Sequence, residues 1–175
     1  MIEHVIARLR PQADPVLLSV QDAHSEMEAF ELVNVSDIVQ RHRGPLTGLC
    51  SAMKYLVDRQ SHSWLLMSPC DAPFLPPDLA SRLFEAAQME DKPVSVVRYE
   101  QVVQPTFSLW NLAVFPQVHD AVMSSGRGGL MSMLDHLPHV SVDWPVEPVP
   151  PFFNVNTPAD LAMAEQLLDA KRSTD

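Results

Sequence analysis

The chain has 175 residues and a formal net charge of −10 at pH 7, and 46% of its residues are hydrophobic while 19% are charged. This composition suits one globular α/β domain over residues 1–175. The acidic balance disfavours a nucleic-acid-coating protein, because polyanion binding needs a concentrated basic surface, but it allows a small nucleotide. No apolar run is long enough to span a bilayer, so neither a membrane nor nucleic acid is an expected partner.

Two features place the chain in the cytoplasm. Met1 leads directly into an amphipathic, charged helix pattern rather than into the apolar core of a secretory signal. The only cysteines are Cys50 and Cys70, too few for a disulfide framework, so a reducing compartment is expected.

Hydrophobic spacing predicts helices that alternate with strands along the chain. Helices are predicted near residues 2–9, 25–30, 45–57, 77–87, 116–124, 129–136 and from 158 onward. Strands are predicted near residues 16–20, 31–35, 64–67, 94–98, 105–110 and 139–142. The order predicts a doubly wound, mostly parallel sheet with helices on both faces.

Asp71 follows the apolar strand at 64–67 in a proline-rich turn, Ser-Pro-Cys-Asp-Ala-Pro-Phe-Leu-Pro. Ligands of open α/β sheets bind at the carboxyl ends of the strands, so Asp71 would face that crevice. A carboxylate in this position suits Mg²⁺, which prefers oxygen ligands and is commonly shared with substrate phosphates. The alternative is that Asp71 only caps the turn.

Asn154 and Asn156 lie in the sequence Phe-Asn-Val-Asn-Thr-Pro ahead of the last predicted helix. If this segment is a strand, its alternation puts both amides on one face, where they can bind a polar ligand. Both can instead satisfy backbone groups at the corner. Thr157 and Asp160 have the spacing of a helix N-cap with its capping box.

Arg127 lies among three of the five glycines, ahead of a predicted helix. Such a segment can bind an anion, although a surface turn explains it equally well. The chain has no dinucleotide-binding glycine fingerprint, Walker-type loop or Gly-x-Ser-x-Gly nucleophile turn.

Four segments together resemble the molybdenum cofactor guanylyltransferase family. They are Gly-Pro-Leu-Thr-Gly (44–48), Cys-Asp-Ala-Pro-Phe (70–74) with Pro-Asp-Leu (77–79), Gln-Pro-Thr (104–106) and Phe-Asn-Val-Asn-Thr-Pro (153–158). Their order and spacing match over essentially the whole chain.

The resemblance implies a Rossmann-like nucleotidyltransferase fold and a magnesium-dependent transfer of GMP from GTP to molybdopterin. It implies that Asp71 holds the Mg²⁺ that bridges the nucleotide phosphates. Its implied nucleotide-binding residues are Ser19, Gly44, Pro45, Leu46 and Asp71, and its implied molybdopterin-binding residues are Asn154, Asn156 and Arg127. Contact with other molybdenum cofactor proteins is a further implied partnership.

The chain departs from the family pattern at three places. Members begin with a buried strand and a Leu-Ala-Gly-Gly loop, whereas Met1 here aligns with the helix that follows them. Ser19 replaces an expected asparagine, and Arg41 replaces an expected aspartate. The missing strand normally lies between the strands at 16–20 and 64–67, which would otherwise pair directly or keep unpaired backbone groups.

These departures keep three hypotheses open. The first is a guanylyltransferase represented by an N-terminally shortened chain with weak or absent activity. The second is a non-catalytic relative that retains a molybdopterin-binding surface. The third is a related nucleotidyltransferase that uses CTP as the nucleotide donor, or one that acts on another phosphorylated acceptor.

Overall fold

The computed structural model of the chain describes residues 1–20, 30–39, 44–124 and 129–172. The helices are α1 (Ile2–Leu9), α3 (Pro45–Val57), α4 (Leu79–Met89), α5 (Phe115–Ser124), α6 (Leu130–His136) and α7 (Pro158–Arg172), with a short 3-10 helix η1 (Leu112–Val114). The strands are β1 (Leu17–Val20), β2 (Val33–Ser36), β3 (Trp64–Met67), β4 (Val94–Tyr99), β5 (Val102–Asn111) and β6 (His139–Trp144). The predicted elements within this range are confirmed except for a strand at 153–156, while most of the predicted 25–30 helix lies outside the described residues.

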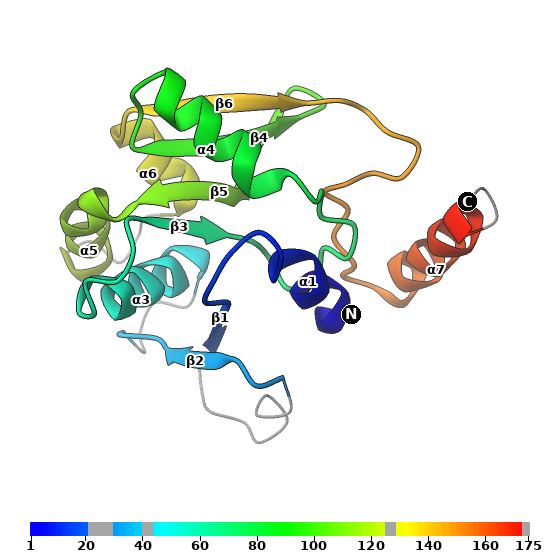
Figure 1. Cartoon of the computed structure of the whole chain (residues 1–175), viewed down its shortest axis with the longest axis horizontal. Coiled ribbons are helices and arrows are strands. Elements are labelled where there is room, and N and C mark those ends of the chain that lie inside the picture. Colours follow the sequence, from blue (N-terminus) through cyan, green and yellow to red (C-terminus); the bar gives the residue numbers. More distant parts are fainter. Residues whose placement is uncertain (21–29, 40–43, 125–128, 173–175) are drawn as a thin grey trace.

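The strands form two sheets (Figure 1). The parallel pair β1–β2 makes the smaller sheet, and the larger sheet has the order β3-β5-β4-β6. Strand β5 runs antiparallel to both β3 and β4, whereas β4 and β6 are parallel. The α/β class is therefore confirmed, but the prediction of a mostly parallel sheet is wrong.

The antiparallel pairing of β4 and β5 follows from their connection. Tyr99 pairs with Val102, which leaves only Glu100 and Gln101 between the strands. Both residues have positive φ angles, 48° and 65°, as in the two-residue turns whose twist matches a hairpin. A parallel pair would need a crossover of about a dozen residues, which this turn cannot provide.

Helices cover both faces of the larger sheet, so the doubly wound arrangement is present (Figure 1). On one face, Met53 of α3 and Val118 of α5 pack with Trp110 in the larger core cluster. On the other face, Leu83 of α4 packs with Phe107 in the second cluster. Alternate residues of β4 and β5 supply the two clusters, as the two-residue period of a strand requires.

A bulge interrupts β5 at the Gln-Pro-Thr segment. The register passes from Val96 opposite Ser108 to Val97 opposite Gln104. Pro105 is tolerated inside this paired strand because a bulge removes the need for its missing N–H. The Ser108 hydroxyl donates to the carbonyl of Pro105 at 2.7 Å and accepts from the indole Nε1–H of Trp110 at 2.8 Å.

Helix α7 begins with the predicted capping box. The backbone N–H of Asp160 donates to the Thr157 hydroxyl at 3.2 Å, and Asp160 Oδ2 accepts from the Thr157 N–H at 2.8 Å. Few apolar side chains of this helix are buried, since Ala164 is buried whereas Leu161 is 44% exposed. Of the described helices, none combines the length and apolarity needed to cross a membrane.

Candidate functional site

The Asp71 turn connects β3 to α4 and is anchored by buried apolar side chains. Ala72 and Leu75 are fully buried, and Phe74 is nearly so. Asp71 itself is half-buried, and its Oδ1 is a buried oxygen without a hydrogen-bond partner among the described residues. The alternative that this carboxylate caps its own turn therefore finds no supporting hydrogen bond in the structure.

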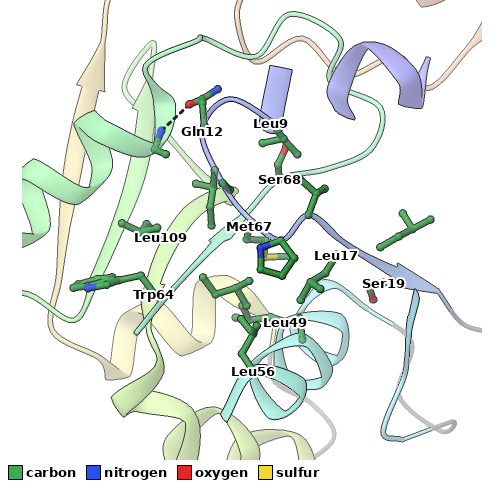
Figure 2. Close-up of a pocket in the computed structure, with 18 of the residues that line it drawn as sticks. Leu9, Gln12, Leu17, Ser19, Leu49, Leu56, Trp64, Met67, Ser68 and Leu109 are labelled. Atoms are coloured by element: carbon green, nitrogen blue, oxygen red, sulfur yellow. Dashed lines mark hydrogen bonds between the residues drawn. The ribbon is translucent and has the colours of Figure 1, made fainter. Parts of the chain in front are cut away.

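Helix α1 and the residues after it hold this turn in place through hydrogen bonds. The guanidinium of Arg8 donates from Nη1 to the carbonyl of Leu75 at 2.8 Å. The Gln12 amide donates to the carbonyl of Pro76 at 2.9 Å and accepts from the N–H of Ala80, in the first turn of α4, at 3.0 Å. The bond from the Ala80 N–H to the Gln12 side chain is the dashed line in Figure 2. The sequence does not reveal this role, since no local pattern marks bonds across more than 60 residues.

The segment carrying Asn154 and Asn156 lies against the Asp71 turn. The backbone N–H of Val155 donates to the carbonyl of Asp71 at 2.9 Å. Residues 153–156 do not form the predicted strand, and the two asparagines differ in burial. Asn154 is half-buried, with an Oδ1 that is buried and unpartnered among the described residues, whereas Asn156 is exposed. Of the two asparagines on either side of Val155, only Asn154 is half-buried with an unpartnered oxygen.

Two buried oxygens without donors, on segments joined by a backbone bond, fit a divalent cation. A buried carboxylate or amide oxygen without a partner is costly, and a cation satisfies both. No cluster of three or more His, Cys, Asp or Glu side chains suited to a metal occurs in the part of the chain that the structure describes. Mg²⁺ nevertheless fits Asp71 and Asn154, because it usually takes only one or two carboxylates and completes its shell with water and substrate phosphates.

A cavity of about 900 Å³ lies between the smaller sheet and β3 (Figure 2). Of the expected nucleotide-binding residues, Ser19, Gly44 and Pro45 line it. Leu46 is buried in the core instead, and Asp71 does not line the cavity. Of the expected nucleotide-binding residues, three thus lie at this cavity, Leu46 lies in the core and Asp71 lies in the neighbouring turn. Cys70 lines the cavity and is the residue before Asp71 in the chain.

Ser19 and Gly48 are in close contact where β1 crosses α3. A Cβ added at Gly48 would lie 2.7 Å from the Ser19 hydroxyl oxygen, so only glycine allows the present position of that hydroxyl. Ser19 is exposed at the cavity, as a ligand-binding side chain would be. Gly48 belongs to the Gly-Pro-Leu-Thr-Gly motif, but nothing in the sequence marks its contact with Ser19.

Two ionisable groups near the cavity have shifted pKa values. Burial, and then the negative charge of Asp71, raise the pKa of the Cys70 thiol. Burial raises the pKa of Asp37, which also lines the cavity. Arg127 and Arg41 lie outside the described residues, so the molybdopterin-binding role expected of Arg127 stays a prediction.

A sequence profile described as "MobA-like NTP transferase domain" matches residues 1–140. The chain belongs to this nucleotidyltransferase family. It is 33% identical over 164 residues to a molybdenum cofactor guanylyltransferase of Rhodopseudomonas palustris (strain HaA2), covering 93% of this chain and 77% of the relative. A second molybdenum cofactor guanylyltransferase, from Brucella ovis, is 31% identical and covers 97% and 79%.

Solved structures show the same fold for this MobA-like transferase. Molybdopterin-guanine dinucleotide biosynthesis protein A from Archaeoglobus fulgidus matches with a TM-score of 0.74 at 19% identity, covering 97% of this chain and 85% of that chain. The 2-C-methyl-D-erythritol 4-phosphate cytidylyltransferase of Thermus thermophilus matches with a TM-score of 0.69 at 19% identity, covering 96% and 88%. A Mycobacterium tuberculosis H37Rv protein in complex with manganese matches with a TM-score of 0.65 at 16% identity, covering 93% and 83%.

Proposed function

We propose that this chain transfers GMP from GTP to molybdopterin and that Asp71 holds the Mg²⁺ required for the reaction. The terminal phosphate oxygen of molybdopterin forms a bond to the α-phosphorus of GTP. The bond between the α-phosphorus and the bridging oxygen breaks, and pyrophosphate leaves. The observation that carries the metal assignment is the buried, unpartnered Oδ1 of Asp71 at the end of β3.

Asp71 and Asn154 would hold the cation through their unpartnered oxygens. The chemistry that Mg²⁺ supplies when bound is neutralisation of the charge that develops on the transferred and leaving phosphates. The protein's own contribution is to hold these ligands in place, through α1 on one side and the Val155 N–H on the other. A related fold solved with manganese supports a divalent ion in this fold.

The other expected binding residues are assigned from their positions relative to the cavity and to Asn154. Ser19, Gly44 and Pro45 would contact the nucleoside, because they share one cavity that leads to Cys70 beside Asp71. Leu46 would support that wall from the core. Asn156, exposed close to Asn154 in the chain, would face molybdopterin. Arg127 keeps the molybdopterin-binding role expected from the sequence.

The direct test is incubation of the 175-residue chain with GTP, MgCl₂ and molybdopterin, followed by measurement of pyrophosphate and of the guanine dinucleotide product. We expect turnover by Asp71→Asn to be lower than that of the wild-type chain by at least about a hundredfold, because the metal ligand is weakened. Asp78→Asn is the matched control, since this exposed carboxylate lies at the start of α4. Equal turnover by wild type and Asp71→Asn would contradict the proposal.

CTP is the second candidate donor. It is favoured by the match to a cytidylyltransferase structure and by Ser19, which stands where the family pattern has asparagine. Running the same assay with CTP decides the donor, because product from CTP and none from GTP would replace the guanylyl assignment. Molybdopterin binding without turnover of either nucleotide would instead indicate a non-catalytic relative.

A further inference from the structure

The connection between β6 and α7 carries Asn154 but has no regular structure of its own. Residues 145–157, all of which the structure describes, form neither a helix nor a strand. In Figure 1 they are the orange connection between β6 and α7. Such a segment takes one conformation only when other contacts hold it, because ordering each backbone residue costs conformational entropy. The contacts of this connection therefore decide where Asn154 lies.

Phe152 anchors the connection on the larger sheet. The centroid of its ring lies 5.6 Å from that of Tyr99 in β4, 4.8 Å from that of Phe107 in β5 and 5.4 Å from that of Trp144 in β6. All three pairs have the edge-to-face arrangement that aromatic rings prefer. Phe152 is 7% exposed, and its three aromatic neighbours are buried as well. One side chain of the connection is thus held by three strands at once.

The residues after this anchor contact the Asp71 turn. The ring centroid of Phe153 lies 6.5 Å from that of Phe74, which belongs to the turn. The backbone N–H of Val155 donates to the carbonyl of Asp71 at 2.9 Å. Asn154 lies between these two contacts in the chain, and its Oδ1 is buried without a partner among the described residues. The connection is therefore held on the sheet at one end and on the turn at the other.

The ring pair of Phe107 and Phe152 joins two of the segments that stand out in the sequence. Phe107 directly follows Gln-Pro-Thr (104–106), and Phe152 directly precedes the segment 153–158. Residues 105–107 form the bulge of β5, since adjacent residues of β4 pair on either side of them. A bulge re-aims side chains, and Phe107 in this bulge is fully buried with its ring against Phe152. The Gln-Pro-Thr bulge thus supports the segment that carries Asn154.

We propose that Phe152 is a positioning residue of the cation site, and that its anchorage among the three rings sets the position of Asn154 relative to Asp71. The inference rests on the proposed function, because it takes these two side chains as the ligands of the divalent cation. Phe152 acts through Asn154 and does not itself contact the cation. A smaller side chain at position 152 leaves space among the rings, and the residues that follow can then shift away from the turn.

The test compares Phe152→Leu with Val118→Ala as the matched control. Both changes remove buried carbon atoms, but Val118 lies in α5, in the core cluster on the other face of the larger sheet. Amide hydrogen exchange at Val155 and Mn²⁺ affinity are measured under conditions in which both variants are folded. We expect Phe152→Leu to speed exchange at Val155 by about tenfold and to weaken Mn²⁺ binding by about five- to tenfold. Val118→Ala should change neither quantity.

A second variant, Phe107→Leu, truncates the opposing ring on β5 and should have the same two effects. Combining it with Phe152→Leu should add little, because both variants loosen the same anchor. Equal exchange at Val155 and equal Mn²⁺ affinity in Phe152→Leu and Val118→Ala would overturn the inference and leave Phe152 as a core residue only. A wild-type chain that binds no Mn²⁺ would instead refute the cation site of the proposed function. Exchange at Val155 would then still decide whether Phe152 holds the connection on the Asp71 turn.

Discussion

The backbone N–H of Val155 donates to the carbonyl oxygen of Asp71 at 2.9 Å, across 84 positions of sequence. This bond brings the turn after β3 together with the segment that precedes α7. Both segments carry a buried side-chain oxygen without a described partner, on Asp71 and on Asn154. The proposed cation site therefore depends on a main-chain contact.

Val155→Pro should weaken divalent-cation binding by roughly five- to tenfold, because it removes the N–H and about 1 kcal/mol of net hydrogen-bond energy. Val155→Ala keeps the N–H and serves as the control. Mn²⁺ titration followed by calorimetry or by paramagnetic relaxation measures the effect. Equal affinities for the two variants would show that this bond does not position the site.

Asp71→Asn should increase the alkylation rate of Cys70 by iodoacetamide near pH 8. Burial raises the pKa of this thiol most, and the Asp71 charge raises it further, so removing the charge increases the thiolate fraction. We expect an increase of about two- to threefold, in proportion to that fraction. Peptide mass mapping separates Cys70 from Cys50, which is fully buried and has a pKa raised to about 11. An unchanged rate would mean that the carboxylate points away from the sulfur.

Ser108→Ala should destabilise the fold by about 1–3 kcal/mol, because the buried indole N–H of Trp110 and the carbonyl of Pro105 both lose their partner. Urea unfolding monitored by tryptophan fluorescence measures this change. Ser81→Ala removes an exposed serine hydroxyl that donates to the carbonyl of Asp78 at the start of α4, and it should cost far less. Similar losses for the two variants would show that the bulge does not depend on the Ser108 hydroxyl.

The start of α7 should lose stability in acid. The N–H of Asn156 and the Thr157 side chain are the main groups that lower the pKa of Asp160 below its usual 3.8. A carboxyl with a lowered folded pKa stabilises the protein above its unfolded pKa, and this contribution is lost as the pH falls through the folded value. Asp160→Asn should therefore unfold at lower urea than wild type at pH 7, and the difference should shrink as the pH falls below 3.8. A difference that persists in acid would rule out the charge as its cause.

Gly48→Ala tests the contact between α3 and β1. Alanine favours a helix over glycine by about 1 kcal/mol, but here its Cβ would lie 2.7 Å from the Ser19 hydroxyl. In a Ser19→Ala background the hydroxyl is absent and the nearest remaining atom is 3.5 Å away, so the full gain should appear. A double-mutant cycle by urea unfolding should show that Gly48→Ala stabilises Ser19→Ala more than it stabilises wild type. Additive effects would mean that the Ser19 hydroxyl makes no unfavourable contact with the methyl group introduced at position 48.

The order of helices and strands could be predicted because the hydrophobic residues of each element recur with the period of a helix or a strand. Residues such as proline and glycine mark where many of these elements begin or end. Strand β3, for example, was predicted with its observed bounds, and α3 begins at Pro45. Strand direction could not be predicted, since Glu100 and Gln101 lack the glycine or asparagine that usually marks a two-residue hairpin turn. Asp71 was identified because a carboxylate after a buried apolar strand is locally visible.

The support around Asp71 was not locally visible. The bonds of Arg8 and Gln12 to the turn join parts of the chain that are far apart in sequence. Asn154 and Asn156 are equivalent in the sequence because they occur in one motif. Only the folded structure shows that Asn154 is half-buried whereas Asn156 is exposed.

The division into two sheets also has a consequence for how the molecule opens. Outside their own pair, β1 and β2 pack mainly on α3, whereas the larger sheet is covered by helices on both faces. Regions with few tertiary contacts open at a lower free-energy cost than the rest of a domain. The β1–β2 pair should thus behave as a separate cooperative unit that detaches first under mild denaturant, while the hairpin of β4 and β5 persists until global unfolding.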